Sequence, residues 1–152
     1  MAGNRGFWKV FAWLAVGGIL LVALVIAFRP VARTGAVAYA QSNLRKVAAA
    51  AERVQAQAGT FGDATRQRLE LDRDLEDLLL IDPDQSSNDS EIVSVLAADG
   101  SWTGSARADT GRCFWIRLEV AGGDASTTVL GTGTDCSAEE ASVADPGSWP
   151  VP

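Results

Sequence analysis

The sequence predicts an α+β fold in which a long N-terminal helix packs on a four-stranded antiparallel sheet. Two observations carry this prediction. Apolar residues recur at helical spacing up to about residue 58. Beyond residue 90 they alternate with polar residues, as they do in half-buried strands. The 152 residues leave room for one modest domain beside a membrane anchor.

The predicted anchor is an uncharged run of 19 residues at 10–28, VFAWLAVGGILLVALVIAF. As a helix this run spans roughly 28 Å, which matches the hydrocarbon core of a bilayer. We therefore expect a transmembrane helix over 10–28, in contact with membrane lipid, after a short cytoplasmic segment or leader at 1–9. The alternative is a cleaved secretory signal, cut after Ala38-Tyr39-Ala40. The length of the run and the charges that follow it favour the uncleaved anchor.

Charge is unevenly distributed along the chain. Residues 1–40 carry a formal charge of +4 and residues 41–152 a charge of −10. Such an acidic domain repels phosphate backbones, which argues against nucleic-acid binding. Basic residues flank the apolar run on both sides, so the positive-inside rule does not decide which end of the run faces the cytoplasm. Because an acidic domain with a disulfide suits an oxidising environment, we place the N-terminus in the cytoplasm and residues 60–152 outside the cell membrane.

The chain has two cysteines, Cys113 and Cys136, and no histidine. In an exported domain two cysteines most simply form one disulfide bond, the alternative being two separate buried thiols. Two thiolates without histidine fall short of a zinc shell, so we expect no metal centre. The sequence contains no dinucleotide-binding or phosphate-binding pattern, and we expect no cofactor.

The segment after the anchor is rich in alanine, and residues 36–58 contain no glycine or proline. We expect an amphipathic extension of the membrane helix over 29–59, ended by Gly59. Its apolar residues form one stripe: Leu44, Val47, Ala48, Ala51, Val54 and Ala58. A second amphipathic helix is expected over 63–81, with Asp63 as its cap.

The predicted sheet occupies about residues 91–131. Strands over 91–98 and 101–108 meet at Asp99-Gly100, a strong two-residue hairpin signal, and are followed by strands over 112–120 and 126–131. Trp102 is expected in the core. Trp115 lies opposite the Phe114 face, where it either packs under the C-terminal tail or contacts a neighbouring molecule. The tail after Cys136 shows no clear structure.

No catalytic constellation is recognisable. Without histidine the usual serine and cysteine triads lack their base, and we expect no enzyme. The loop after residue 81 places oxygen ligands at alternate positions, which makes Asp82, Asp84 and Asn88 calcium candidates. The glycine of an EF-hand loop is missing, so the preferred interpretation is a solvated acidic loop.

Four short motifs carry a resemblance to a known family: SNLR at 42–45 before AAAAE, AGTF at 58–61, GRCFW at 111–115 and GTGTDC at 131–136. They are similar to segments of type IV pilins and pseudopilins, in particular of high-GC Gram-positive bacteria. The resemblance implies a membrane-anchored structural subunit of a surface filament or secretion assembly. Its partners would be other pilin-like subunits or a membrane protein complex.

The family's processing site is similar to Arg5-Gly6-Phe7, which implies cleavage between Gly6 and Phe7. The family's glutamate, four residues after that phenylalanine, is replaced here by Phe11, which suits a minor subunit. The alternative function is a single-pass accessory protein with an extracytoplasmic binding domain. In an assembly we expect packing against neighbouring helices through small residues, namely Gly17, Gly18, Ala36, Ala40, Ala48 and Ala51.

Overall fold

The computed structural model describes residues 35–121 and 126–149 of the chain. The expected transmembrane helix over 10–28, the processing site at Gly6 and Phe7, and the packing glycines Gly17 and Gly18 lie outside the described residues. Among the helices in the described part of the chain, none has the length and apolar character needed to cross a membrane.

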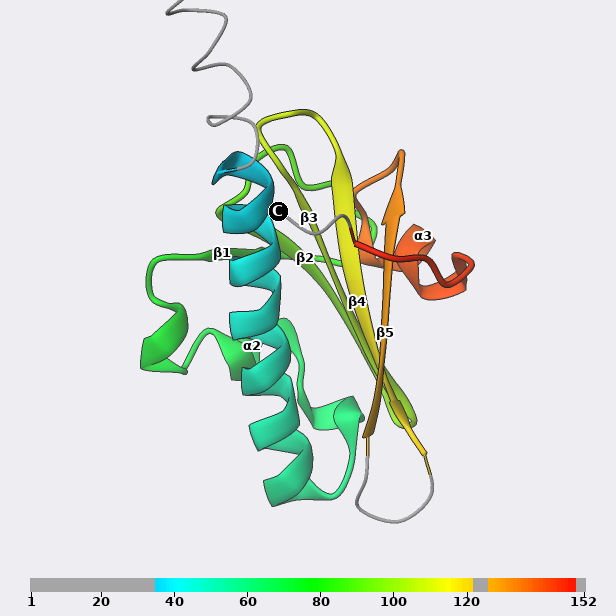
Figure 1. Ribbon diagram of the computed structural model, residues 1–152. Helices are drawn as coiled ribbons and strands as arrows, with labels where there is room; N and C mark the ends of the chain where they lie inside the picture. The colour runs from blue at the N-terminus through cyan, green and yellow to red at the C-terminus, as the bar shows by residue number, and fades with distance from the viewer. Residues whose placement is uncertain (1–34, 122–125, 150–152) are drawn as a thin grey trace, which may run out of the picture. The chain divides into compact units, whose positions relative to one another are not determined.

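Residues 35–58 form a single helix of 24 residues (Figure 1). It ends where the sequence predicts, because Gly59 adopts a φ of +82° and its N–H donates to the carbonyl oxygen of Gln55 at 2.7 Å. Leu44, Val47 and Ala51 on its apolar stripe are fully buried. The helix therefore covers one face of the sheet with the stripe that the sequence marks.

The sheet has five strands in the order β1-β2-β3-β4-β5. β1 pairs with β2 in parallel, and every other neighbouring pair is antiparallel. The strands are β1 (Leu79–Ile81), β2 (Ile92–Ala98), β3 (Ser101–Arg107), β4 (Cys113–Val120) and β5 (Ser126–Gly133). The remaining short elements are η1 (Phe61–Asp63), α2 (Arg66–Leu69), η2 (Arg73–Leu75) and α3 (Ala138–Val143).

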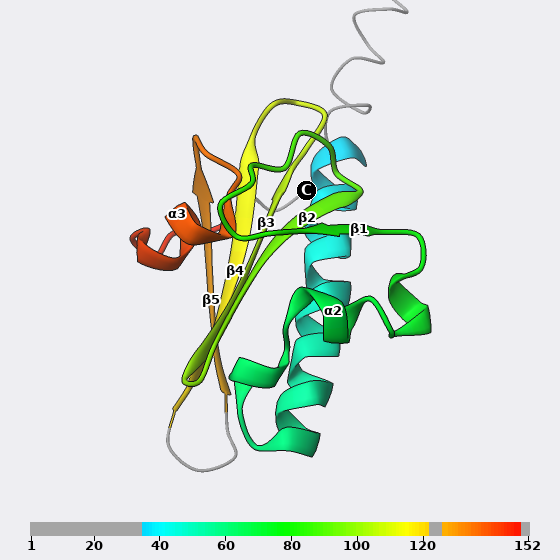
Figure 2. The ribbon, with the colours of Figure 1, turned by 180° about the vertical axis from the view of Figure 1, so that it is seen from behind.

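The predicted fold class, a long N-terminal helix on a four-stranded antiparallel sheet, is therefore wrong. The sheet is mixed, because the apolar run before Asp82 forms the additional strand β1, with Leu80 opposite Val93 of β2 (Figure 2). We expected this run to end a helix over 63–81. A short apolar run fits a buried strand and a helix end equally well, and pairing with β2 satisfies the backbone groups of β1.

That expected helix is broken into short turns by its own polar side chains. The hydroxyl of Thr65, and not Asp63, caps α2 by accepting from the N–H of Arg68 at 3.4 Å. Asp72 then caps η2 by accepting from the N–H of Asp74 at 3.0 Å. Because these side chains bond to nearby backbone groups, each begins a new short helix, and the segment does not form one continuous helix.

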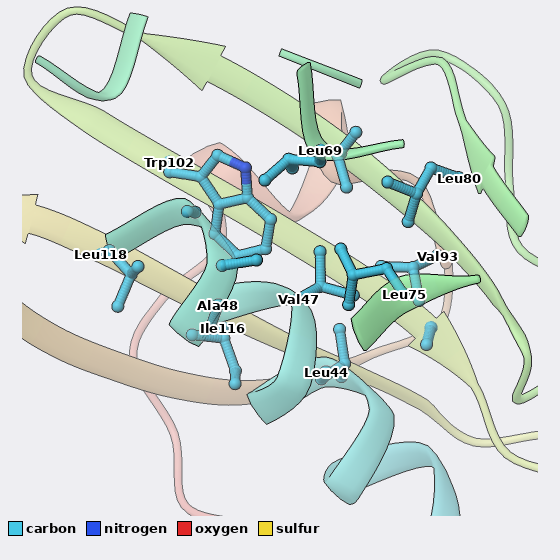
Figure 3. Close-up of a cluster of buried hydrophobic side chains, with 14 of the residues drawn as sticks. Leu44, Val47, Ala48, Leu69, Leu75, Leu80, Val93, Trp102, Ile116 and Leu118 are labelled. Carbon is cyan, nitrogen blue, oxygen red and sulfur yellow. The ribbon is translucent and has the colours of Figure 1, made fainter. Parts of the chain in front are cut away.

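The main core lies between helix 35–58 and the sheet (Figure 3). Trp102 of β3 is fully buried, as the sequence predicts, and lies among Leu118 and Ile116 of β4 and the helix residues Val47 and Ala48. Burying a side chain of this size removes 150–250 Å² of surface from water in general, so Trp102 is the largest single contribution to this layer.

The opposite face of the sheet is covered by α3, an element that the sequence analysis did not expect. Ser137 caps it, and Ala138 and Ala141 are buried. The hydroxyl of Ser94 on β2 accepts from the N–H of Ala138 at 2.9 Å and donates to the carbonyl oxygen of Asp82 at 3.0 Å. Since Ser94 points away from the face occupied by Val93, α3 and helix 35–58 lie on opposite sides of the sheet.

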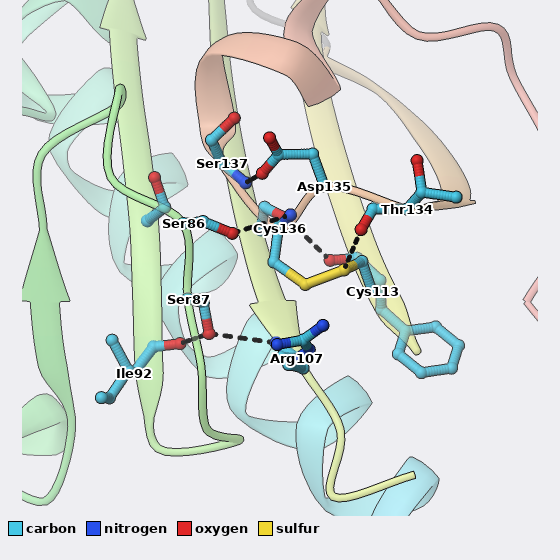
Figure 4. The surroundings of a disulfide bond; sticks show 12 residues. Ser86, Ser87, Ile92, Arg107, Cys113, Thr134, Asp135, Cys136 and Ser137 are labelled. Carbon is cyan, nitrogen blue, oxygen red and sulfur yellow. Dashed lines mark hydrogen bonds between the residues drawn. A yellow bond between two sulfur atoms is a disulfide. The ribbon is translucent and has the colours of Figure 1, made fainter. Parts of the chain in front are cut away.

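The predicted disulfide bond between Cys113 and Cys136 is confirmed, with a Cα–Cα separation of 5.1 Å (Figure 4). It joins the start of β4 to the segment just before α3, and both cysteines are buried. The loop over 82–90 packs against the bridge, because the N–H of Ser87 donates to the carbonyl oxygen of Cys136 at 3.1 Å. The bridge thus fixes the second covering layer to the sheet.

Replacing both Cys113 and Cys136 by alanine should lower the free energy of unfolding by about 3 kcal/mol, the chain-entropy value for a loop of this length. Denaturant unfolding of the oxidised protein and the double variant measures the difference. Wild-type protein under reducing conditions is the matched control and should lose a similar amount. A loss below about 1 kcal/mol in both would contradict the role assigned to the bridge.

Candidate functional site

The outward face of helix 35–58 combines small residues with cations. Ser42, Ala49 and Ala56 are exposed at seven-residue intervals, and Arg45 and Lys46 are exposed between them. Residues seven apart on a helix lie on nearly the same side, so the three small residues form one strip. Side chains this small allow another helix to approach closely.

The alanines expected to pack against neighbouring helices lie elsewhere. Ala40, Ala48 and Ala51 are at most 6 % exposed and belong to the domain's own core, and Ala36 is half-buried. They face the sheet because the apolar stripe of the helix must be covered by its own domain. A neighbouring molecule would therefore meet Ala49 and Ala56 instead.

Two of the helix cations are paired with the acidic segment 70–77. Lys46 Nζ lies 2.9 Å from Asp77 Oδ2, and Arg53 Nη2 lies 2.6 Å from Asp72 Oδ2. The hydrogen bond from Arg53 lowers the pKa of Asp72 below its usual value, and that from Lys46 lowers the pKa of Asp77. The pairs neutralise much of the charge beside the strip of small residues.

A surface groove of about 220 Å³ lies between the C-terminal half of helix 35–58 and α2. It is lined by apolar side chains and by charged ones of both signs, and Leu71 among them is 74 % exposed. The lining residues are Ala50, Arg53, Val54, Gln57, Arg68, Leu69, Leu71 and Asp72. The groove thus combines apolar side chains with charged ones.

The calcium candidates Asp82, Asp84 and Asn88 lie in the loop between β1 and β2. Asp82 Oδ1 lies 3.3 Å from Arg66 Nε, and Asp84 and Asn88 are exposed. Residues 35–121 and 126–149 contain no group of three or more histidine, cysteine, aspartate or glutamate side chains placed to hold a metal ion. The loop is ordered by Ser87 instead, whose hydroxyl donates to the carbonyl oxygen of Ile92 at 2.7 Å.

Trp115 is enclosed by its own domain, at 1 % exposure. Its indole ring lies against Gly131 of β5, where a Cβ atom would overlap the ring. Arg117 covers the ring, with the guanidinium carbon 5.5 Å from the ring centroid. Of the two placements left open for Trp115, the structure shows packing within the domain and leaves little of its side chain on the surface.

Residues 144–149, here named the C-terminal strap, cross the edge of β5. Arg117 fixes the start of the strap by donating from Nη1 to the carbonyl oxygens of Ser142 at 2.8 Å and Ala144 at 3.2 Å. Farther along, the N–H of Gly147 donates to the carbonyl oxygen of Leu130 at 2.9 Å. The strap therefore passes from the α3 side of the sheet to the side of helix 35–58.

Trp149 ends the strap and is only 8 % exposed. Its Nε1–H donates to the carbonyl oxygen of Gly131 at 3.0 Å and lies 3.3 Å from that of Trp115. The Arg45 guanidinium lies 4.9 Å from the Trp149 ring centroid, and Phe114 meets the ring edge-on at 6.0 Å. A tryptophan between prolines in a polar tail gives no periodic signal, so sequence reasoning did not assign it this place.

Replacing Gly131 by alanine should lower the free energy of unfolding by about 1–3 kcal/mol, because the new methyl group overlaps the Trp115 ring. Gly133→Ala is the matched control in the same strand, since a Cβ atom there meets only the carbonyl oxygen of Asp135 at 3.4 Å. Thermal unfolding of both variants gives the comparison. Equal stability of the two would contradict the packing described for Trp115.

Replacing Asp72 by asparagine should destabilise the protein at neutral pH by an amount that disappears in acid. The pKa of Asp72 is lowered in the folded state, so its pairing with Arg53 stabilises the fold fully above the ordinary carboxyl value of 3.8. This stabilisation declines below that value and is lost as the pH falls through the lowered pKa of the folded state. Urea unfolding of both proteins in a pH series from neutral pH to well below the ordinary carboxyl value tests this. Glu76→Gln, an exposed acid outside the pair, is the control and should show no such convergence.

Comparison with protein-family models, with curated proteins and with solved structures finds no match to this chain. The features that bear on function are therefore those of the chain itself. They are the apolar run at 10–28, the strip of small residues on helix 35–58, the groove beside α2 and the C-terminal strap.

Proposed function

We propose that this chain is a membrane-anchored structural subunit, minor in number, of a surface filament or secretion assembly. The observation that carries the proposal is the form of helix 35–58, which follows the apolar run after six residues and presents Ser42, Ala49 and Ala56 outward. One helix thus has an inner stripe for its own domain and an outer strip for a neighbour.

The electrostatics of this face support close packing between subunits. Lys46 and Arg53 on the same helix are held by Asp77 and Asp72 of their own domain. Like-charge repulsion between neighbouring helices is thereby reduced, and the side chains are kept to one side of the strip. The sheet adds no support, because its mixed topology departs from the one expected from the resemblance.

A second candidate is an accessory protein that binds a partner in a membrane complex. Phe11, which stands where the pilin resemblance implies a glutamate, suits this candidate as well as a minor subunit and does not separate the two. The groove beside α2, with Leu71 exposed on its rim, offers a contact surface for such a partner. The two candidates use different surfaces and can be separated by substitution.

Replacing Ala49 by glutamate should reduce incorporation into the assembly at least tenfold, because the longer charged side chain blocks helix approach at the centre of the strip. The free energy of unfolding should change by less than about 0.5 kcal/mol, since the site is exposed. Cross-linking in native membranes followed by immunoprecipitation measures incorporation, and circular dichroism measures folding.

Ala98→Glu is the matched control, because Ala98 is also exposed but lies on β2, on the face opposite Ala97, which packs against the core. A Leu71→Glu variant tests the second candidate. Loss of partners only in Leu71→Glu, with Ala49→Glu unaffected, would replace the assembly proposal by the accessory one. Unchanged cross-linking in both would contradict both functions.

A further inference from the structure

The C-terminal strap is attached to its own domain by one buried side chain and a few hydrogen bonds, including the one from Arg117 to Ala144. Asp145, Pro146, Gly147 and Ser148 are all exposed, and only Trp149 is buried. Among the described residues, the strap and β5 share one main-chain hydrogen bond, that from Gly147 to Leu130. The strap is therefore a short extended tether with an aromatic anchor at its end.

The socket that receives Trp149 is built from parts outside the strap. Phe114 of β4 and Arg45 of helix 35–58 contact the ring, and the carbonyl oxygens of Trp115 and Gly131 receive its N–H. Phe114 is fully buried in the main core, and both carbonyls belong to paired strands. The socket thus consists of groups held by the sheet and the helix and not by the strap, and it suits an extended peptide that ends in tryptophan.

The outer edge of β5 has little protection of its own, although the Ser126 hydroxyl at its start donates to Glu52 Oε1 of helix 35–58 at 3.3 Å. Residues 126–129, Ser-Thr-Thr-Val, carry no charge and no proline, and the first three are exposed. Native edge strands are commonly guarded by lysine, proline or a bulge, because unpaired backbone groups attract another strand. Here the strap covers only the part of the edge near Leu130 and Gly131.

We propose that the strap exchanges between two copies of this chain, so that Trp149 of each copy fills the socket of the other across facing β5 edges. A second copy is the occupant because its strap fits the socket by construction and reproduces every contact of the closed form. The six residues 144–149 can span roughly 20 Å when extended, enough to cross between adjacent edges. Arg117 keeps the start of each strap fixed in either arrangement.

The exchanged pair has two-fold symmetry, because each copy gives one strap and receives one. This inference uses only the described domain, so it does not depend on the proposed function. If the chain is anchored in a membrane, as proposed above, confinement to one surface raises the effective concentration of straps and favours exchange.

The test measures the oligomeric state of the full-length chain in detergent micelles, by sedimentation over a wide range of protein concentration. The wild type should dimerise in a concentration-dependent way, and Trp149→Ala should dimerise at least tenfold more weakly. The peptide Ala-Asp-Pro-Gly-Ser-Trp should dissociate the wild-type dimer and bind Trp149→Ala at one site per chain. The same peptide ending in alanine is the control ligand, and Val143→Ala, exposed just before the strap, is the control variant.

Three results would overturn the exchange. The first is a wild-type chain that remains monomeric at every concentration. The strap would then only cover the socket of its own copy, even if Trp149→Ala binds the peptide. The second is a dimer that neither Trp149→Ala nor the peptide weakens. Trp149→Phe guards against a folding defect, since it keeps an aromatic ring but lacks the N–H donor. The third is a folded Trp149→Phe that dimerises as strongly as the wild type and resists the peptide.

Discussion

The structure depends first on the burial of one helical stripe. Leu44, Val47 and Ala51 are all removed from water by the sheet, and truncation of a residue such as Leu44 generally costs 2–5 kcal/mol. Because this stripe must face the sheet, the orientation of helix 35–58 is fixed, and so is the choice of residues left outside. The outward strip that we assign to assembly is a consequence of that inward packing.

The second layer depends on a different kind of constraint. α3 is short and buries only small side chains, so hydrophobic burial alone holds it weakly. Covalent and polar links compensate: the bridge at Cys136 precedes α3, the Ser94 hydroxyl bonds to its first turn, and Arg117 bonds to its last carbonyls. A cation at the C-terminal end of a helix also interacts favourably with its dipole.

Sequence reasoning succeeded where periodicity and turn chemistry are local. The helix over 35–58, the hairpin at Asp99-Gly100 and the burial of Trp102 all follow from patterns within a few residues. It failed at β1, since a short apolar run fits helix or strand and only the distant partner β2 decides between them. Trp149 was missed for the same reason, because its socket is assembled from residues as far away as Arg45.

These observations also explain where contact surfaces lie on the described part of the chain. Both faces of the sheet are covered from within the chain, and two of the helix cations are neutralised by nearby carboxylates. Buried polar groups such as Ser87 and Ser94 are used to join loops to strands, which leaves them no role toward a ligand. What the described domain can still offer to another molecule lies at its margins, on the outer helix strip, in the groove beside α2 and along the β5 edge. Of these, the β5 edge differs from the others because the chain already supplies, in Trp149, a ligand of matching shape.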